Sequence, residues 1–179
     1  MRKVLFLDRD GVINVDVNYL YRVEDLQFVP GAPEALVAAV NAGYDLIVVT
    51  NQSGIARGYY TEKDMHTLHE EINRRLTAQG APILHFYYCP HHVQGTVPEF
   101  TKECECRKPK SGLLRQAMSD YEIDQSLSFM VGDKSSDITA AEGAGLAGYL
   151  FDGTNLETFL LPILQKYETK AKGTSHERV

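Results

Sequence analysis

The sequence lacks three features that would indicate other classes of protein: a long apolar run, a block of basic residues and an even set of cysteines. Its apolar runs fall far short of the roughly 20 residues that span a membrane, and residues 1–3 lead into an apolar strand rather than a signal peptide. The 18 basic residues stand against 24 acidic ones, so the net charge of −6 would repel nucleic acid. We expect a cytoplasmic protein that binds neither membranes nor nucleic acid and captures an anionic small molecule through local charges.

The three cysteines, Cys89, Cys104 and Cys106, all lie in one short stretch. An odd number confined to one segment is typical of a reducing compartment and a metal site, not of a disulfide framework. Together with His91 they offer three thiolates and an imidazole, the ligand set of a closed structural zinc site. We predict Zn²⁺ bound by Cys89, His91, Cys104 and Cys106. His92 is the alternative histidine, and the plainer alternative is three incidental cysteines beside a solvated histidine.

The chain alternates short apolar runs with stretches of helical periodicity, which predicts an α/β fold with a doubly wound parallel sheet. Predicted strands cover residues 4–7, 46–50, 83–88, 127–131 and 148–151, and predicted helices begin near residues 30, 61, 111, 137 and 156. No internal repeat or low-complexity linker divides the chain. We therefore predict one domain over residues 1–170, a polar and mobile tail at residues 171–179, and a monomer.

Local signals mark the ends of some of these elements. Thr61 and Asp64 have the spacing of a capping box at the start of a helix, and Gly43 and Gly80 are expected to end two helices. Residues 14–29 lack periodicity and are predicted to form a functional loop or a small hairpin. Residues 89–110 lack it too, so something other than a core, here the predicted zinc, must hold them.

Two carboxylates follow the first predicted strand. Asp8 and Asp10 point to the same side of an extended chain, and Gly11 permits a sharp turn. Buried carboxylates need compensation, for which a divalent cation is the obvious candidate; the alternative is a solvated acidic turn. Sites in a doubly wound sheet form beyond the carboxyl ends of strands, which here also bring Thr50 and Asp133 to the same edge.

These residues predict phosphoryl transfer. Asp8, Asp10 and Asp133 can hold Mg²⁺, which prefers oxygen ligands and usually bridges to a substrate phosphate. A carboxylate nucleophile can split hydrolysis into two easier steps through an aspartyl-phosphate. Thr50 is placed to donate to the transferring phosphoryl group, and Lys108 or Lys134 to neutralise its charge.

The order and spacing of these segments resemble the four motifs of the haloacid-dehalogenase-like phosphatases, with a likeness that extends over residues 3–151. The matching segments are residues 8–12, 50–51, 108–109 and 132–133. In the last motif, Asp137 would support the turn at Asp133.

The resemblance implies a role for each motif residue. Asp8 would be the nucleophile, and Asp10 the general acid that protonates the leaving alkoxide and later acts as base toward water. Asp8, Asp133 and the backbone carbonyl of Asp10 would bind Mg²⁺. Thr50 and Lys108 would stabilise the phosphoryl group during transfer.

The predicted zinc loop, residues 89–106, and residues 15–19 and 50–58 are similar to those of one subfamily. This subfamily acts on heptose 1,7-bisphosphates in lipopolysaccharide and surface-layer biosynthesis. The likeness implies removal of the C7 phosphate, recognition of the distal end of the substrate by Arg107, and no large mobile cap. It implies substrate contacts from Asp8, Arg9, Asp10, Asp16, Val17, Asn18, Tyr19, Thr50, Asn51, Gln52, Ser53, Arg107, Lys108 and Lys134.

Two other functions are weighed against this one. The histidinol-phosphate phosphatases share the acidic motifs and the zinc loop but typically differ at the positions of residues 16–19 and 53–58. A phospho-accepting receiver domain also places carboxylates around Mg²⁺, although its phosphorylated aspartate normally lies on a separate central strand, and here the third strand ends in Cys89. His66 and His69 lie three apart with no partnering acid motif, so we expect a solvated helix face there rather than a metal site.

Overall fold

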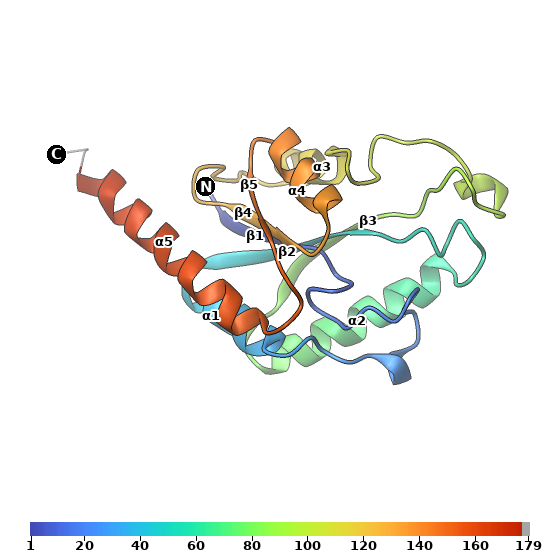
Figure 1. Ribbon diagram of the computed structural model, residues 1–179, viewed down its shortest axis with the longest axis horizontal. Helices are drawn as coiled ribbons and strands as arrows, with labels where there is room; N and C mark the ends of the chain where they lie inside the picture. The colour runs from blue at the N-terminus through green and yellow to red at the C-terminus, as the bar shows by residue number, and fades with distance from the viewer. Residues whose placement is uncertain (177–179) are drawn as a thin grey trace.

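The computed structural model describes residues 1–176, built around a parallel sheet with the strand order β3-β2-β1-β4-β5. Figure 1 shows helices on both faces of this sheet. The strands are β1 (Lys3–Leu7), β2 (Tyr44–Asn51), β3 (Ile83–Cys89), β4 (Phe129–Gly132) and β5 (Ala147–Leu150). The helices are α3 (Gly112–Asp120) and α4 (Ser135–Gly143) on one face, and α1 (Ala32–Asn41), α2 (Glu62–Ala78) and α5 (Leu156–His176) on the other. The predicted α/β fold is confirmed.

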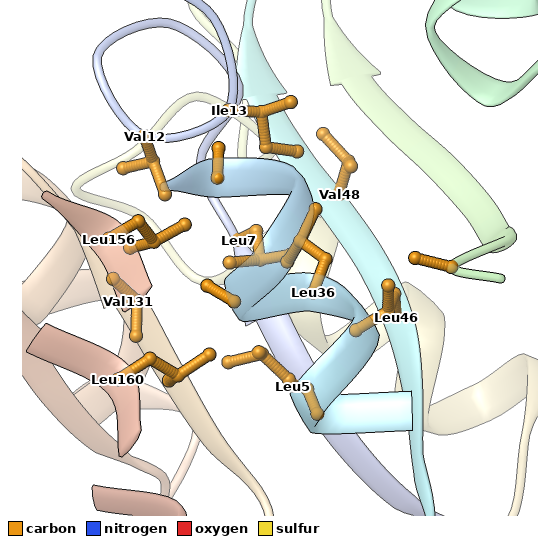
Figure 2. Packing of buried hydrophobic residues seen from close by; sticks show 14 of the residues in the cluster. Leu5, Leu7, Val12, Ile13, Leu36, Leu46, Val48, Val131, Leu156 and Leu160 are labelled. Carbon is orange, nitrogen blue, oxygen red and sulfur yellow. The ribbon is translucent and has the colours of Figure 1, made fainter. Parts of the chain in front are cut away.

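The central strand β1 contributes side chains to the hydrophobic core on each face of the sheet. Leu5 and Leu7 pack into the core under α1 and α5, where Figure 2 shows them among leucines and valines of neighbouring elements. Val4 and Phe6 point to the opposite face and pack against residues of α3 and α4. All four side chains are fully buried, so an unbroken apolar run is what this strand requires.

The predicted helix signals are present as hydrogen bonds and backbone angles. Thr61 accepts a hydrogen bond from the Asp64 amide at 3.1 Å, and Asp64 accepts one from the Thr61 amide at 3.0 Å, which completes the capping box of α2. Gly43 and Gly80 follow α1 and α2 with φ of 91° and 96°, a left-handed conformation that favours glycine. Their positions therefore end both helices as predicted.

The two segments predicted to be irregular contain some regular structure. Residues 14–29 return on themselves, because Asn14 and Phe28 form an antiparallel bridge and the 3-10 helix η1 (Val23–Asp25) makes the far end. Residues 89–110 contain one short 3-10 helix, η2 (Pro98–Phe100), and extend beyond the carboxyl ends of the strands in Figure 1.

The last helix is longer than its apolar periodicity indicates. α5 continues to His176, so residues 171–176 extend the helix, and residues 177–179 of the predicted tail lie outside the described residues. Polar contacts support this extension: Glu168 pairs with Lys172 at 2.9 Å, and Lys170 Nζ donates to the Ser126 carbonyl at 2.6 Å. None of the helices within residues 1–176 is long and apolar enough to cross a membrane.

Candidate active site

The acidic residues meet at the carboxyl edge of the sheet because β1 lies between β2 and β4. Asp8 follows β1 directly, and its amide donates to the Val131 carbonyl of β4 at 3.2 Å. Thr50 lies near the end of β2 and Asp133 follows β4. Asp8 and Thr50 are buried. The structure thus brings together the three strand ends that the sequence singled out.

Lys108 is the buried cation of this site. Its Nζ lies 2.9 Å from Asp8 Oδ1, 2.6 Å from Asp137 Oδ1 and 2.9 Å from the Val49 carbonyl oxygen. Burial alone would lower the pKa of Lys108, but the charges of Asp8 and Asp137 outweigh it and the pKa lies above its usual value. The side chain is therefore a fully paired ammonium beside the predicted nucleophile. Its loop is held by Asn51, whose side chain accepts from the Lys108 amide at 3.0 Å and donates to the Lys108 carbonyl at 3.1 Å.

Asp10 is held by hydrogen bonds to both of its oxygens. Oδ1 accepts from Arg9 NH2 at 2.9 Å, Arg9 Nε at 3.3 Å and Asn14 Nδ2 at 3.0 Å. Oδ2 accepts from Gln52 Nε2 at 3.1 Å, and the same Nε2 donates to Thr50 Oγ1 at 2.8 Å. Burial would raise the pKa of Asp10, but the Arg9 charge and these hydrogen bonds outweigh it and lower the pKa below its usual value. Asp10 is thus a carboxylate in the free protein.

The residues predicted to bind Mg²⁺ fit a cation. Carboxylate oxygens of Asp8, Asp133 and Asp137 lie within 4.8 Å of one another. Asp133 Oδ1 is buried without a hydrogen-bond partner among the described residues, which suits a metal ligand. Asp137 is already occupied, because its Oδ1 faces Lys108 and its Oδ2 accepts from the amides of Asp133 and Lys134. Its predicted role of supporting the turn at Asp133 is confirmed, and Asp8 and Asp133 are the carboxylates left for a cation.

Gly11 allows the backbone after β1 to pass close to the Asp133 carboxylate. It has a φ of 85°, and a Cβ atom added there would lie 2.1 Å from Asp133 Oδ2. Without a bound cation, burial and the nearby carboxylates Asp137 and Asp10, opposed by Lys108, raise the pKa of Asp8 to about 7. Burial also raises the pKa of Asp133. A nearby positive charge is what would keep both of these groups ionised.

A cavity of about 510 Å³ opens beside these groups. Most of the residues predicted to contact substrate line it, namely Asp10, Asp16, Asn18, Tyr19, Asn51, Gln52, Ser53, Arg107, Lys108 and Lys134. A groove of about 740 Å³ lies between α1 and α5, but at the opposite end of β1 and β2, away from the acidic pair. We therefore assign the site to the smaller cavity.

Four residues predicted to contact substrate do not line this cavity. Asp8 and Thr50 are buried. The Val17 side chain is exposed outside it. The Arg9 side chain is fully buried and bonds to Asp10, His69 and the Leu20 carbonyl, so the predicted contact of Arg9 with substrate is left to its backbone. Its charge is used to hold Asp10 instead.

The structure adds residues beyond those predicted to contact substrate. Arg57 and Tyr60 line the cavity, and the Tyr60 hydroxyl donates to Gln52 Oε1. His69 is buried at 4% exposure and contacts Arg9, so the predicted solvated helix face is wrong for it, whereas His66 is exposed. A signal existed for His69, because position 69 lies on the same helical stripe as the buried side chains of α2. No comparable pattern marks Arg57.

The cysteine cluster forms a second candidate metal centre. One ligand atom from each of Cys89, His91, Cys104 and Cys106 lies within 4.8 Å of the others, with Sγ to Sγ distances of 2.9–3.5 Å. His91 Nδ1 lies 3.4 Å from Cys106 Sγ, whereas His92 Nδ1 accepts from the Gln94 amide. The structure thus places His91, not His92, in the cluster. The contact with Cys89 lowers the pKa of the Cys106 thiol to about 5, so the cluster already favours one thiolate.

Known proteins are similar in sequence to this chain over most of its length. A HAD-hydrolase-like family model matches residues 105–155. The D-glycero-alpha-D-manno-heptose-1,7-bisphosphate 7-phosphatase of Photorhabdus laumondii is 48% identical over 144 residues, which cover 80% of this chain and 79% of that protein. The D-glycero-beta-D-manno-heptose-1,7-bisphosphate 7-phosphatase of Rhodopseudomonas palustris is 39% identical over 170 residues, 95% of this chain and 94% of that protein. This chain belongs to the heptose-1,7-bisphosphate 7-phosphatase family.

Solved structures agree with membership of the heptose-1,7-bisphosphate 7-phosphatase family. A HAD-like phosphatase from Mesorhizobium loti is 34% identical, covers 94% of this chain and 87% of its own, and superposes with a TM-score of 0.85. The D,D-heptose 1,7-bisphosphate phosphatase of B. bronchiseptica, complexed with magnesium and phosphate, is 28% identical over 92% of this chain and 99% of its own, with a TM-score of 0.79. The chain is thus a phosphoric monoester hydrolase, and the receiver-domain alternative is set aside.

Proposed function

We propose that this enzyme removes the C7 phosphate of D-glycero-D-manno-heptose 1,7-bisphosphate, using Mg²⁺, in the cytoplasmic synthesis of nucleotide-activated heptose. The observation that carries the proposal is the composition of one cavity. The cavity is lined by the acidic group Asp10, by the catalytic Lys108 and by three further cationic side chains, Arg57, Arg107 and Lys134. A substrate with a phosphate at each end matches this arrangement. The relatives are named for a substrate of that form, a heptose 1,7-bisphosphate.

The two arginines offer unsatisfied donors for the second phosphate. Arg107 NH1 and Arg57 Nε are buried and have no hydrogen-bond partner among the described residues. A guanidinium forms strong, charge-assisted hydrogen bonds with phosphate, and a buried donor without a partner is costly. Phosphate binding would satisfy both donors. This supports the predicted role of Arg107 at the distal end of the substrate and adds Arg57 to it.

The chemistry assigned to the chain is a two-step displacement. In the first step, the Asp8 carboxylate forms a bond to phosphorus as the bond to the C7 oxygen breaks. Lys108 neutralises charge on the transferring group, and the Thr50 hydroxyl donates to it. Thr50 Oγ1 accepts from Gln52 Nε2 and donates to the Asn51 carbonyl at 3.4 Å, a long hydrogen bond that a bond to the phosphoryl group would replace. In the second step, water attacks phosphorus, which releases phosphate and restores Asp8.

Asp10 moves the proton in both steps. It gives a proton to the C7 oxygen as that oxygen leaves, and later takes one from the attacking water. Its lowered pKa suits the second role in the free protein. The first role needs proton uptake before transfer, which an approaching phosphate dianion favours because like charge raises the pKa of a carboxyl group.

Two metals would complete the site. Mg²⁺ held by Asp8, Asp133 and the Asp10 backbone carbonyl would supply positive charge opposite the phosphoryl oxygens. Zn²⁺ held by Cys89, His91, Cys104 and Cys106 would be structural. The last of these cysteines directly precedes Arg107 and Lys108, so the zinc loop would fix both substrate-facing cations.

The test measures phosphate release from a substrate panel: both anomers of the heptose 1,7-bisphosphate, histidinol phosphate and a hexose bisphosphate. We expect the highest kcat/KM on one of the heptose anomers. A higher value on histidinol phosphate would favour that alternative. Asp8→Asn should abolish turnover while Asp25→Asn, an exposed aspartate outside the cavity, retains it. Unchanged turnover in Asp8→Asn would refute the nucleophile, and a mass near 40 kDa by light scattering would refute the predicted monomer of 20.0 kDa.

A further inference from the structure

Arg9 carries a charge into the interior, where every donor needs an acceptor. It is the largest fully buried side chain among the described residues. Asp10 Oδ1 accepts from its Nε and NH2, and the Leu20 carbonyl accepts from NH2 at 2.9 Å. The third nitrogen, NH1, lies 3.1 Å from His69 Nε2. The guanidinium is therefore held from three sides, one of them by α2.

The contact with Arg9 fixes the state of His69. A guanidinium can only donate, so Nε2 must accept, and the imidazole is neutral with its hydrogen on Nδ1. Nδ1 is buried and has no hydrogen-bond partner among the described residues, so the contact with Arg9 is the one hydrogen bond of this ring. Burial, with the charges of Arg9 and His66, lowers the pKa of His69 well below its ordinary value, in keeping with a neutral ring. The ring also stacks on Phe86 of β3, with centroids 4.3 Å apart and planes at 14°. His69 thus offers a rigid acceptor.

The orientation of the Asp10 carboxylate follows from that of Arg9. Oδ1 accepts from Arg9 and from Asn14, so this oxygen is occupied by the protein. Oδ2 accepts one hydrogen bond, from Gln52 Nε2. Because Asp10 lines the cavity, Oδ2 is the oxygen left to exchange a proton there.

We propose that His69 is a positioning residue for proton transfer. By accepting from Arg9 NH1, it fixes the guanidinium, and the guanidinium in turn directs Asp10 Oδ2 at the oxygen of the leaving group. The inference rests on the proposed function, in which Asp10 protonates that oxygen. Loss of the acceptor would leave a buried NH1 unpaired and free the guanidinium to shift, and small misplacements of catalytic groups cost large factors in rate.

The experiment compares two leaving groups in one set of variants. The heptose bisphosphate releases an alkoxide that needs a proton, whereas p-nitrophenyl phosphate releases a phenolate that needs little help. kcat/KM reports the steps up to phosphoryl transfer. For His69→Phe, which keeps a ring against Phe86 but lacks Nε2, we expect kcat/KM to fall about 10–100-fold on the heptose bisphosphate and less than about threefold on p-nitrophenyl phosphate. His69→Gln, whose amide oxygen can accept from NH1, should restore most of the loss.

His66→Phe is the matched control, since His66 is exposed three residues earlier on the same helix and should leave both values unchanged. Equal losses on the two substrates, or no recovery in His69→Gln, overturn the proposal. If the wild-type enzyme hydrolyses p-nitrophenyl phosphate but not the heptose bisphosphate, the proposed substrate is refuted and the role of His69 is not. An alkyl phosphate that the enzyme does hydrolyse then replaces the heptose bisphosphate in the comparison. Should His69→Phe not fold, the ¹⁵N NMR spectrum of the wild-type imidazole decides, because a hydrogen on Nε2 overturns the proposal.

Discussion

Lys108 lies between two carboxylates in a buried part of the site. Its Nζ contacts both Asp8 and Asp137 and is 3% exposed. Removing one partner of a buried ion pair leaves a charge without compensation, which destabilises a protein more than the pair itself stabilises it. We therefore expect this lysine to stabilise the fold in addition to its proposed role in the reaction.

Lys108→Met tests both roles. We expect turnover to fall about 100–1000-fold, the cost of losing one donor to the transferring group. We expect the free energy of unfolding to fall by about 3 kcal/mol, because Asp8 and Asp137 then face each other unscreened. Denaturant titration and phosphate release measure the two effects. Lys102→Ala, an exposed lysine of the zinc loop, should change neither, and a turnover within tenfold of the wild type in Lys108→Met would contradict the assignment.

The zinc loop, residues 89–106, has little regular structure, with one short 3-10 helix after the end of β3. Cys89 ends β3, while the other ligands lie in irregular chain. The binding free energy of a structural metal becomes folding free energy of the segment that it closes. Zinc is therefore expected to order the loop and the cations that follow it.

Cys104→Ser and His92→Ala separate a ligand from its neighbour. Protein purified without added metal should carry about one equivalent of zinc, as a closed four-ligand site implies. Cys104→Ser should lose it, with a lower Tm and weaker turnover, because Arg107 and Lys108 lose their anchor. His92→Ala should keep the metal, since His92 lies outside the cluster. Absence of zinc from the wild type, together with an unchanged Tm in Cys104→Ser, would contradict the prediction.

Elements with a strong local signal could be predicted from the sequence, and those that depend on distant contacts could not. The capping box at Thr61 and the glycines after α1 and α2 act within a few residues, so their pattern is visible in the chain. The end of α5 was missed because polar contacts, not apolar periodicity, extend it.

The same distinction applies to the site. Asp8, Thr50 and Asp133 could be predicted to converge, because the carboxyl ends of parallel strands share one edge. The inward turn of Arg9 could not be, since its partner His69 is 60 positions away on a helix. From the sequence alone, a charged residue within a catalytic motif is readily predicted to be a substrate ligand, because the burial of its side chain is unknown.

For the whole molecule, cation binding and stability are linked through Asp8. Its pKa of about 7 without metal lies above the ordinary value of 3.8, so the folded state holds this proton more tightly than the unfolded state. The stability that this group contributes is present below about pH 4 and is lost as pH rises through about 7. Mg²⁺ competes with the same proton, so its affinity should fall about tenfold for each pH unit below 7.

The measurement is the rise in Tm on adding Mg²⁺ at several pH values. We expect a large rise at pH 8 and a small one at pH 5.5, because a tenfold loss of affinity removes about 1.4 kcal/mol of stabilisation, or roughly 3–5 °C for a protein of this size. Asp8→Asn, which lacks the titrating ligand, should show a small rise at every pH. A rise independent of pH in the wild type would contradict the linkage.

The hydrogen bond from Arg9 to the Leu20 carbonyl bears on how the enzyme discriminates between substrates. Leu20 belongs to the segment whose residues Asp16, Asn18 and Tyr19 line the cavity. Arg9 therefore makes hydrogen bonds both to this segment and to Asp10. A compound that displaces this segment would also disturb Asp10, the group that we propose moves the proton. We therefore expect poor substrates to bind without being turned over, so that discrimination appears in kcat more than in KM.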